Sequence, residues 1–151
     1  LVLGQLDAIA YIHRSLRVGG QSNRQMNQMS GGPKPTFTPK QGQYLAFIDA
    51  YTRGIAKFPG DARLYRHRGH RYVTVREFDK AIADFDAALG IDPGYYEVYA
   101  NKGEVLEARG SVKEALEAYG EYLGRATSPR DGKRAAGIRE RVRVLRGASP
   151  G

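Results

Sequence analysis

Residues 62–95 read ARLYRHRGHRYVTVREFDKAIADFDAALGIDPGY, and residues 96–129 read YEVYANKGEVLEARGSVKEALEAYGEYLGRATSP. A shift of 34 positions lays the first stretch on the second and matches aromatic, small and apolar residues in the same order. The matched residues are Tyr65, Gly69, Tyr72, Ala81, Phe85 and Leu89 in the first stretch and Tyr99, Gly103, Leu106, Ala115, Tyr119 and Leu123 in the second. A fixed period of this length is typical of repeat architectures, so each stretch is one structural unit.

Each unit carries its apolar residues at helical spacing in two blocks. The blocks are separated near residues 75–77 in the first unit and at residues 109–110 in the second. Asp61 is a favourable helix N-cap, whereas Gly90 and the turn at 92–94 are typical of a helix end. The sequence therefore predicts two helical hairpins, with helices near 62–74, 77–90, 95–109 and 112–125.

Small residues recur at matching places in both hairpins. Gly69 and Gly103 lie in the middle of predicted helices, where glycine costs about 1 kcal/mol relative to alanine, so we expect a packing reason. Ala81 and Ala115 lie on the second helix of each pair. Because paired small residues let two helices approach closely, we expect the glycines and alanines to meet.

The first unit resembles the tetratricopeptide repeat family at Tyr65, Gly69, Tyr72, Phe78, Ala81, Phe85, Ala88 and Pro93. The second unit keeps the pattern at Tyr99, Gly103, Leu106, Gly110, Ala115 and Tyr119. It departs at Tyr122, where the family has a small residue, and at Thr127, where it has proline; Arg68 and Lys102 replace a favoured leucine. The resemblance implies an all-α, right-handed α-solenoid of helical hairpins, and the departures predict a looser second unit.

Two further segments carry helical stripes that would complete so short an array. In residues 41–58 the stripe has the register of a repeat's second helix and consists of Tyr44, Phe47, Ile48, Tyr51 and Ile55. In residues 131–146 the stripe is Ala135, Ile138, Val142 and Leu145, surrounded by Arg134, Arg139, Arg141, Arg143 and Arg146. A basic surface around an apolar stripe predicts a polar-faced C-terminal capping helix.

The remaining segments complete the predicted domain map. Residues 1–18 predict an N-terminal amphipathic helix, and residues 19–39, rich in Gln, Asn, Ser, Gly and Pro, predict a flexible linker. The repeat domain then covers residues 40–146 and is followed by a tail at 147–151. Because the chain begins at Leu1 and holds only two full repeats, a further interpretation is that it is a piece of a longer repeat protein.

The composition argues against an enzyme. Without cysteine the chain has no disulfide, thiolate metal site or cysteine nucleophile, and it contains no phosphate-binding glycine loop or nucleophile elbow. His67 and His70 could share a metal, but arginines flank them and no third ligand is evident, so exposed histidines are expected. We expect no enzymatic activity, cofactor or metal. No apolar run is long enough to span a membrane, so we expect a soluble chain, with a cytoplasmic location favoured.

The charge pattern supports an alternative function. Residues 1–58 hold seven basic and two acidic groups, a balance of +5, and residues 130–151 have the same balance. Residues 36–48 also resemble the opening helix of winged-helix repressors of the LexA type, although no recognition helix or wing follows. The alternative is therefore a nucleic-acid-associated regulator that uses the basic termini and this helix.

The tetratricopeptide resemblance implies a different and leading function, a scaffold that binds a protein or peptide. In that family the first helix of each repeat lines a concave groove; here that face has Arg63, Arg66, His70 and Val73 in one unit and Glu97, Asn101, Glu104 and Glu107 in the next. Arg66, His70 and Asn101 resemble part of the carboxylate clamp that holds a peptide C-terminus. The predicted binding residues are Arg63, Arg66, His70, Glu97, Asn101 and Glu104. Arg63 is expected beside Glu97 and His70 beside Glu104, while Arg66 has no acidic counterpart.

Overall fold

The structure is a computed structural model that describes residues 39–148. Within this range the helices are α2 Pro39–Lys57, α3 Ala62–Thr74, α4 Phe78–Ile91, α5 Glu97–Arg109, α6 Val112–Arg125 and α7 Gly132–Ala148, with a 3-10 turn η1 at Pro129–Asp131 and no strand. The predicted helix at 1–18, the linker up to residue 38 and the end of the tail at 149–151 lie outside the described residues. Residue 39, the last of the predicted linker, is the first residue of α2.

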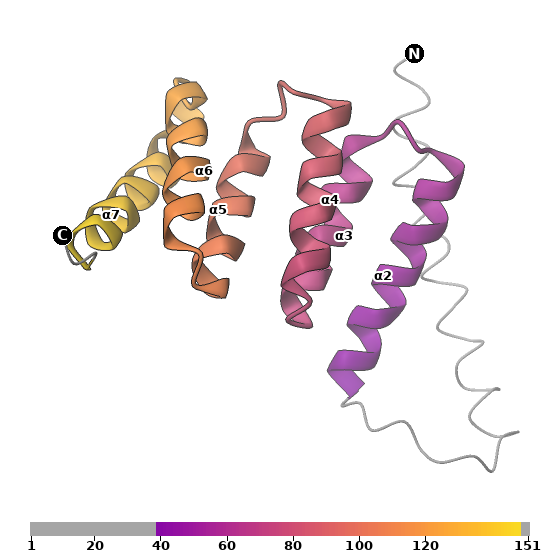
Figure 1. Cartoon of the computed structure of the whole chain (residues 1–151). Helices are drawn as coiled ribbons and strands as arrows, with labels where there is room; N and C mark the ends of the chain where they lie inside the picture. The colour runs from indigo at the N-terminus through magenta and orange to yellow at the C-terminus, as the bar shows by residue number, and fades with distance from the viewer. Residues whose placement is uncertain (1–38, 149–151) are drawn as a thin grey trace, which may run out of the picture.

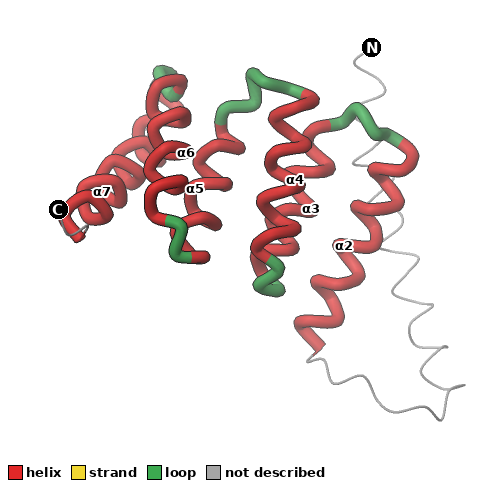
Figure 2. Tube along the Cα trace, in the orientation of Figure 1, coloured by secondary structure: helices red, strands yellow, loops and turns green. Residues whose placement is uncertain are grey.

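The described helices form a two-layered array (Figures 1 and 2). Helices α3 and α4 form one hairpin and α5 and α6 the next; α2 packs on α3, α4 on α5, and α6 on α7. In Figure 1, α4 lies in front of α3 and α6 in front of α5, so the first helices and the second helices form separate layers. The predicted all-α, right-handed solenoid of helical hairpins is confirmed for these residues. None of the described helices combines the length and apolar character of a membrane-spanning segment.

The start of α3 and the end of α5 follow from local sequence, whereas α5 begins at Glu97, two residues after the predicted start. Asp61 caps α3 by accepting a hydrogen bond from the Arg63 amide at 3.0 Å. Gly110 ends α5 in the left-handed region at φ 89°, a conformation that glycine adopts without steric cost. Gly90, which the sequence predicted as a helix end, lies inside α4, because the helix continues to Ile91 before the turn at 92–94.

The two mid-helix glycines are close packing contacts. A Cβ added at Gly69 would lie 2.8 Å from Cε1 of Phe85, and one added at Gly103 would lie 2.5 Å from Cε1 of Tyr119. The nearest neighbour of each glycine is thus an aromatic ring of the second helix, not the alanine that the sequence predicted. The two alanines, Ala81 and Ala115, are fully buried in the same apolar clusters as the two rings. Their small side chains leave room for the rings.

The C-terminal helix α7 is docked by both polar and apolar contacts. In η1, Asp131 accepts a hydrogen bond from the Ser128 amide at 3.1 Å and one from the Tyr96 hydroxyl at 3.0 Å. Beyond η1, Ala135 and Ile138 are buried in the cluster that contains Tyr122. The helix begins one residue later than the predicted 131–146 and runs two residues further. Its apolar stripe covers the second repeat, as expected of a cap.

Candidate functional site

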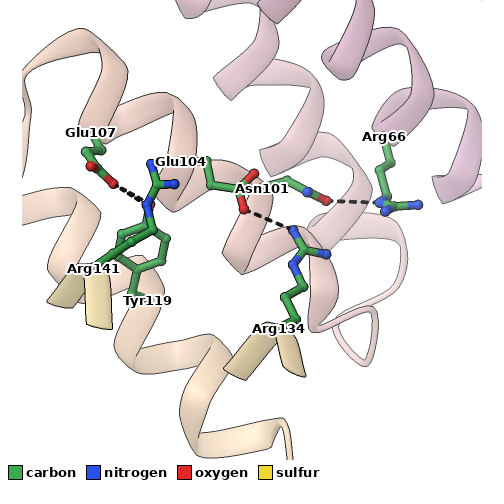
Figure 3. Close-up of polar contacts among 7 residues, drawn as sticks. All are labelled: Arg66, Asn101, Glu104, Glu107, Tyr119, Arg134 and Arg141. Atoms are coloured by element: carbon green, nitrogen blue, oxygen red, sulfur yellow. Dashed lines mark hydrogen bonds and ion pairs between the residues drawn. The ribbon is translucent and has the colours of Figure 1, made fainter. Parts of the chain in front are cut away.

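Arg66 and Asn101 form a polar contact between the first helices of the two repeats. The Arg66 Nε donates to Oδ1 of Asn101 at 3.0 Å, and its second nitrogen donates to the Tyr95 hydroxyl at 3.0 Å (Figure 3). The Arg66 guanidinium also lies 5.4 Å from the centre of the Tyr95 ring. All of these partners are neutral. Arg66 has no ion pair within residues 39–148, so its positive charge is oriented by neighbours but not neutralised by them.

His70 is joined to this contact through a hydrogen bond with Asn101. Its ring meets the Phe85 ring edge to face, with centroids 5.5 Å apart. Burial, followed by the positive charges of Arg66, His67 and Arg134, lowers the pKa of His70 to about 4, although a hydrogen bond with Asn101 opposes the shift. The neutral imidazole therefore contributes a hydrogen-bonding group rather than a second charge at neutral pH.

Two ion pairs join α5 to α7 on the same face (Figure 3). Arg134 approaches Glu104, with 3.4 Å between the guanidinium nitrogen and the carboxylate oxygen. One turn further along α5, Glu107 accepts a hydrogen bond at its Oε2 from the Arg141 Nε at 2.9 Å. Helices α3, α5 and α7 thus contribute to one polar surface, which we call the first-helix face: Arg66, His70, Asn101, Glu104, Glu107, Arg134 and Arg141.

Arg63 and Glu97 lie nearer the start of their helices than this cluster. Arg63 makes two hydrogen bonds to the carboxylate of Asp61, at 3.0 and 2.7 Å. It also lines, with Tyr95, an open pocket of about 450 Å³ between the start of α3 and the end of α4. Glu97 is half-buried in the first turn of α5. Arg63 thus binds the cap of its own helix, and its predicted position beside Glu97 stays a prediction.

For the second predicted pair, His70 with Glu104, the ion-pair partner of Glu104 is Arg134. Burial leaves His70 without the positive charge that would attract a carboxylate. His67 and His70, which were expected to be exposed, are half-buried against aromatic rings. His67 stacks on Tyr51, with ring centroids 5.7 Å apart. No group of three metal-ligating side chains occurs in the part of the chain that the structure describes.

Sequence reasoning missed the contributions of Tyr95 and of α7. Tyr95 lies in the turn between repeats, where periodicity does not indicate orientation. Arg134 could have been found, because it follows Arg66 by two repeat lengths and so occupies the same position on its own helix. Arg141 likewise follows Glu107 by one repeat length. Helix α7 is therefore more than a cap, because it occupies the place of the first helix of a third repeat.

The comparisons with curated proteins find relatives that contain such repeats. Small glutamine-rich tetratricopeptide repeat-containing protein 2 of Saccharomyces cerevisiae is 36% identical over 80 residues, which cover 53% of this chain and 23% of that protein. The Hsp70-Hsp90 organizing protein of Triticum aestivum is 28% identical over 112 residues, covering 74% of this chain and 19% of that protein. The chain thus spans about a fifth of the length of these relatives. No family model matches it.

Solved structures share both the fold and part of the sequence. The second tetratricopeptide domain of Spaghetti (RPAP3), bound to the HSP90 peptide SRMEEVD, is 30% identical with a TM-score of 0.52; the match covers 56% of this chain and 78% of that one. The first domain of the same protein, bound to the same peptide, is 25% identical with a TM-score of 0.57, covering 68% of this chain and 82% of that one. The chain belongs to the tetratricopeptide repeat family.

Proposed function

We propose that the chain is a non-catalytic scaffold whose first-helix face binds a peptide or protein segment through a carboxylate. The observation that carries this proposal is the Arg66 guanidinium, which Asn101 and Tyr95 orient without neutralising. An arginine held in this way can form charge-assisted hydrogen bonds to a carboxylate, which are stronger than hydrogen bonds between neutral groups. Asn101 is buried, so its amide is fixed in place for a ligand that reaches Arg66.

The geometry favours an extended segment that crosses the first helices. Arg66 and His70 come from α3, Asn101 from α5 and Arg134 from α7, so a ligand that touches all of them must run across the array. The comparison supports the same class of ligand, because both domains of Spaghetti (RPAP3) are bound to SRMEEVD, a peptide with acidic residues near its C-terminus. We therefore choose this peptide as the probe.

The proposal is tested by measuring the affinity of the full chain for SRMEEVD and for the same peptide with an amidated C-terminus. We expect the free carboxylate to bind more tightly, and Arg66→Ala to weaken its binding by about 1.5–3 kcal/mol, the usual contribution of a hydrogen bond to a charged group. Asn101→Ala is expected to weaken it as well.

A matched control removes the same charge elsewhere. Arg53 lies on α2, outside the first-helix layer, and its side chain is 55% exposed in an ion pair with Asp49. Arg53→Ala should leave the affinity unchanged. If Arg66→Ala and Asn101→Ala both bind as tightly as the unmodified chain, the carboxylate site is not on this face.

A further inference from the structure

The two ion pairs between α5 and α7 differ in how firmly their carboxylates are held. Glu107 accepts hydrogen bonds from the Tyr119 hydroxyl at 2.7 Å and from Arg141 at 2.9 Å. Although burial alone would raise the pKa of Glu107, these two hydrogen bonds outweigh it and lower the pKa. Because Tyr119 is fully buried, its hydroxyl has little access to water as a substitute. The Glu107 carboxylate is therefore fixed.

Glu104 is held by much less. It pairs with Arg134 at the long distance of 3.4 Å, and the side chains of Glu104 and Arg134 are 40% and 34% exposed. Exposed ion pairs of this kind contribute little to stability, since water and salt compete with them. The Arg134 guanidinium can therefore exchange Glu104 for another carboxylate at small cost.

The position of the pair places this exchange beside the proposed carboxylate site. Asn101 and Glu104 are three residues apart on α5, so their side chains are neighbours on one helix surface. In Figure 3 Asn101 reaches toward Arg66 and Glu104 toward Arg134. Arg134 is also close enough to lower the pKa of His70, which the hydrogen bond to Asn101 joins to the same cluster. This part of the first-helix face thus brings together the guanidinium groups of Arg66 and Arg134 and the carboxylate of Glu104.

We propose that Arg134 is a second anion-binding residue and that Glu104 occupies it in the free protein. This inference rests on the proposed function. Glu104 acts as an internal competitor: a ligand with a single carboxylate leaves the Glu104–Arg134 pair intact, whereas a ligand with a further acidic group displaces Glu104 and binds both arginines. Glu104 thereby sets the minimum negative charge of a ligand that binds tightly.

The test compares three glutamate-to-glutamine variants of α5 in binding to SRMEEVD. Glu104→Gln should tighten binding about 3- to 5-fold, the factor that corresponds to release of an exposed ion pair. Glu107→Gln should not tighten it, because that carboxylate holds Arg141 and Tyr119 in place. Glu97→Gln removes the same charge from the same helix without releasing Arg134, and should have a smaller effect than Glu104→Gln.

A double-mutant cycle separates release of Arg134 from a general change in charge. In the Glu104→Gln background, Arg134→Ala should abolish the gain; in the unmodified chain, it should change affinity less. A gain that persists without Arg134, or equal gains from Glu97→Gln and Glu104→Gln, would show that only long-range charge is at work and would overturn the inference.

The remaining outcomes separate this inference from the proposed function. If the unmodified chain binds the peptide and Arg66→Ala weakens binding, but Glu104→Gln does not tighten it, the internal competitor is wrong and the carboxylate site stands. If neither the unmodified chain nor Glu104→Gln binds at millimolar peptide, both proposals fail.

Discussion

The two repeats are built on the same contact and differ in what that contact is connected to. In the first repeat, the Phe85 ring packs on Gly69 and against the edge of His70. In the second, Tyr119 packs on Gly103 and its hydroxyl donates to Glu107, which also binds Arg141 of α7. The Tyr119 hydroxyl, which Phe85 lacks, thus links the packing contact of the second repeat to α7 through Glu107.

The departures from the family pattern predicted a looser second repeat, but the core of that repeat is filled. Tyr122, which stands where a small residue is usual, is fully buried. The centroids of the Tyr122 and Tyr96 rings are 6.0 Å apart. The Tyr96 hydroxyl in turn bonds Asp131 in η1. The large residue fills the space between the repeat and α7, so the core of the second repeat extends into the next helix.

The largest effect is expected from deleting residues 131–146. The deletion removes α7, exposes the apolar surface around Tyr122 and leaves Glu107 without Arg141. We expect aggregation or loss of a cooperative unfolding transition, because terminal repeats need a polar outer face. Thermal unfolding followed by circular dichroism, with size-exclusion chromatography, measures both. A monomer with an unchanged melting transition would show that the second repeat does not depend on α7.

A smaller effect is expected from filling the two glycine contacts. Gly103→Leu and Gly69→Leu should each reduce the free energy of unfolding by at least about 2 kcal/mol, since overpacking forces strain on a close helix pair. Gly103→Leu should cost more, because the contact is tighter and the Tyr119 hydroxyl prevents its ring from moving aside. Urea unfolding gives both values. Equal costs would mean that the hydroxyl does not restrain the ring.

The charged residues that replace the favoured leucine also differ between the repeats. Arg68 makes two hydrogen bonds to Asp84, whose side chain is 7% exposed, whereas Lys102 pairs with Asp86, which is 51% exposed. Removing one partner of a buried pair leaves the other charge uncompensated, so Asp84→Asn should cost about 2–3 kcal/mol. Asp86→Asn should cost less than about 1 kcal/mol. Similar costs in urea unfolding would contradict the difference in burial.

The last effect concerns pH and belongs to the first repeat. The folded state lowers the pKa of His70 to about 4, so between that value and the unfolded value of about 6.5 the unfolded chain binds more protons. Stability should therefore fall as the pH falls through this window, and His70→Gln should flatten that dependence. Urea unfolding at pH 7 and pH 4.5 measures the change. If both chains lose the same stability, His70 is not the group that titrates.

The sequence predicted the helical hairpins well because they depend on local periodicity and on a repeated offset. It predicted less of the polar face, since ion pairs depend on which helices become neighbours. Arg68 meets Asp84 sixteen residues later, a spacing with no meaning until the hairpin closes. The repeat register indicates Arg134, whereas the arginine-rich surface of 131–146 indicates only a cap. The alternative of a nucleic-acid-associated regulator stays a prediction, because much of the basic N-terminal part lies outside the described residues.

The central claim is that a carboxylate ligand binds the first-helix face at Arg66 and Asn101. Nuclear magnetic resonance of the isotope-labelled full chain, titrated with SRMEEVD, tests it directly through the side-chain amide of Asn101 and the Nε–H of Arg66. The account predicts that both signals shift with saturation, along with backbone amides of α3 and α5. Saturable shifts confined to α2, or to exposed residues of α6 such as Glu114 and Glu117, would place the ligand elsewhere and contradict the account.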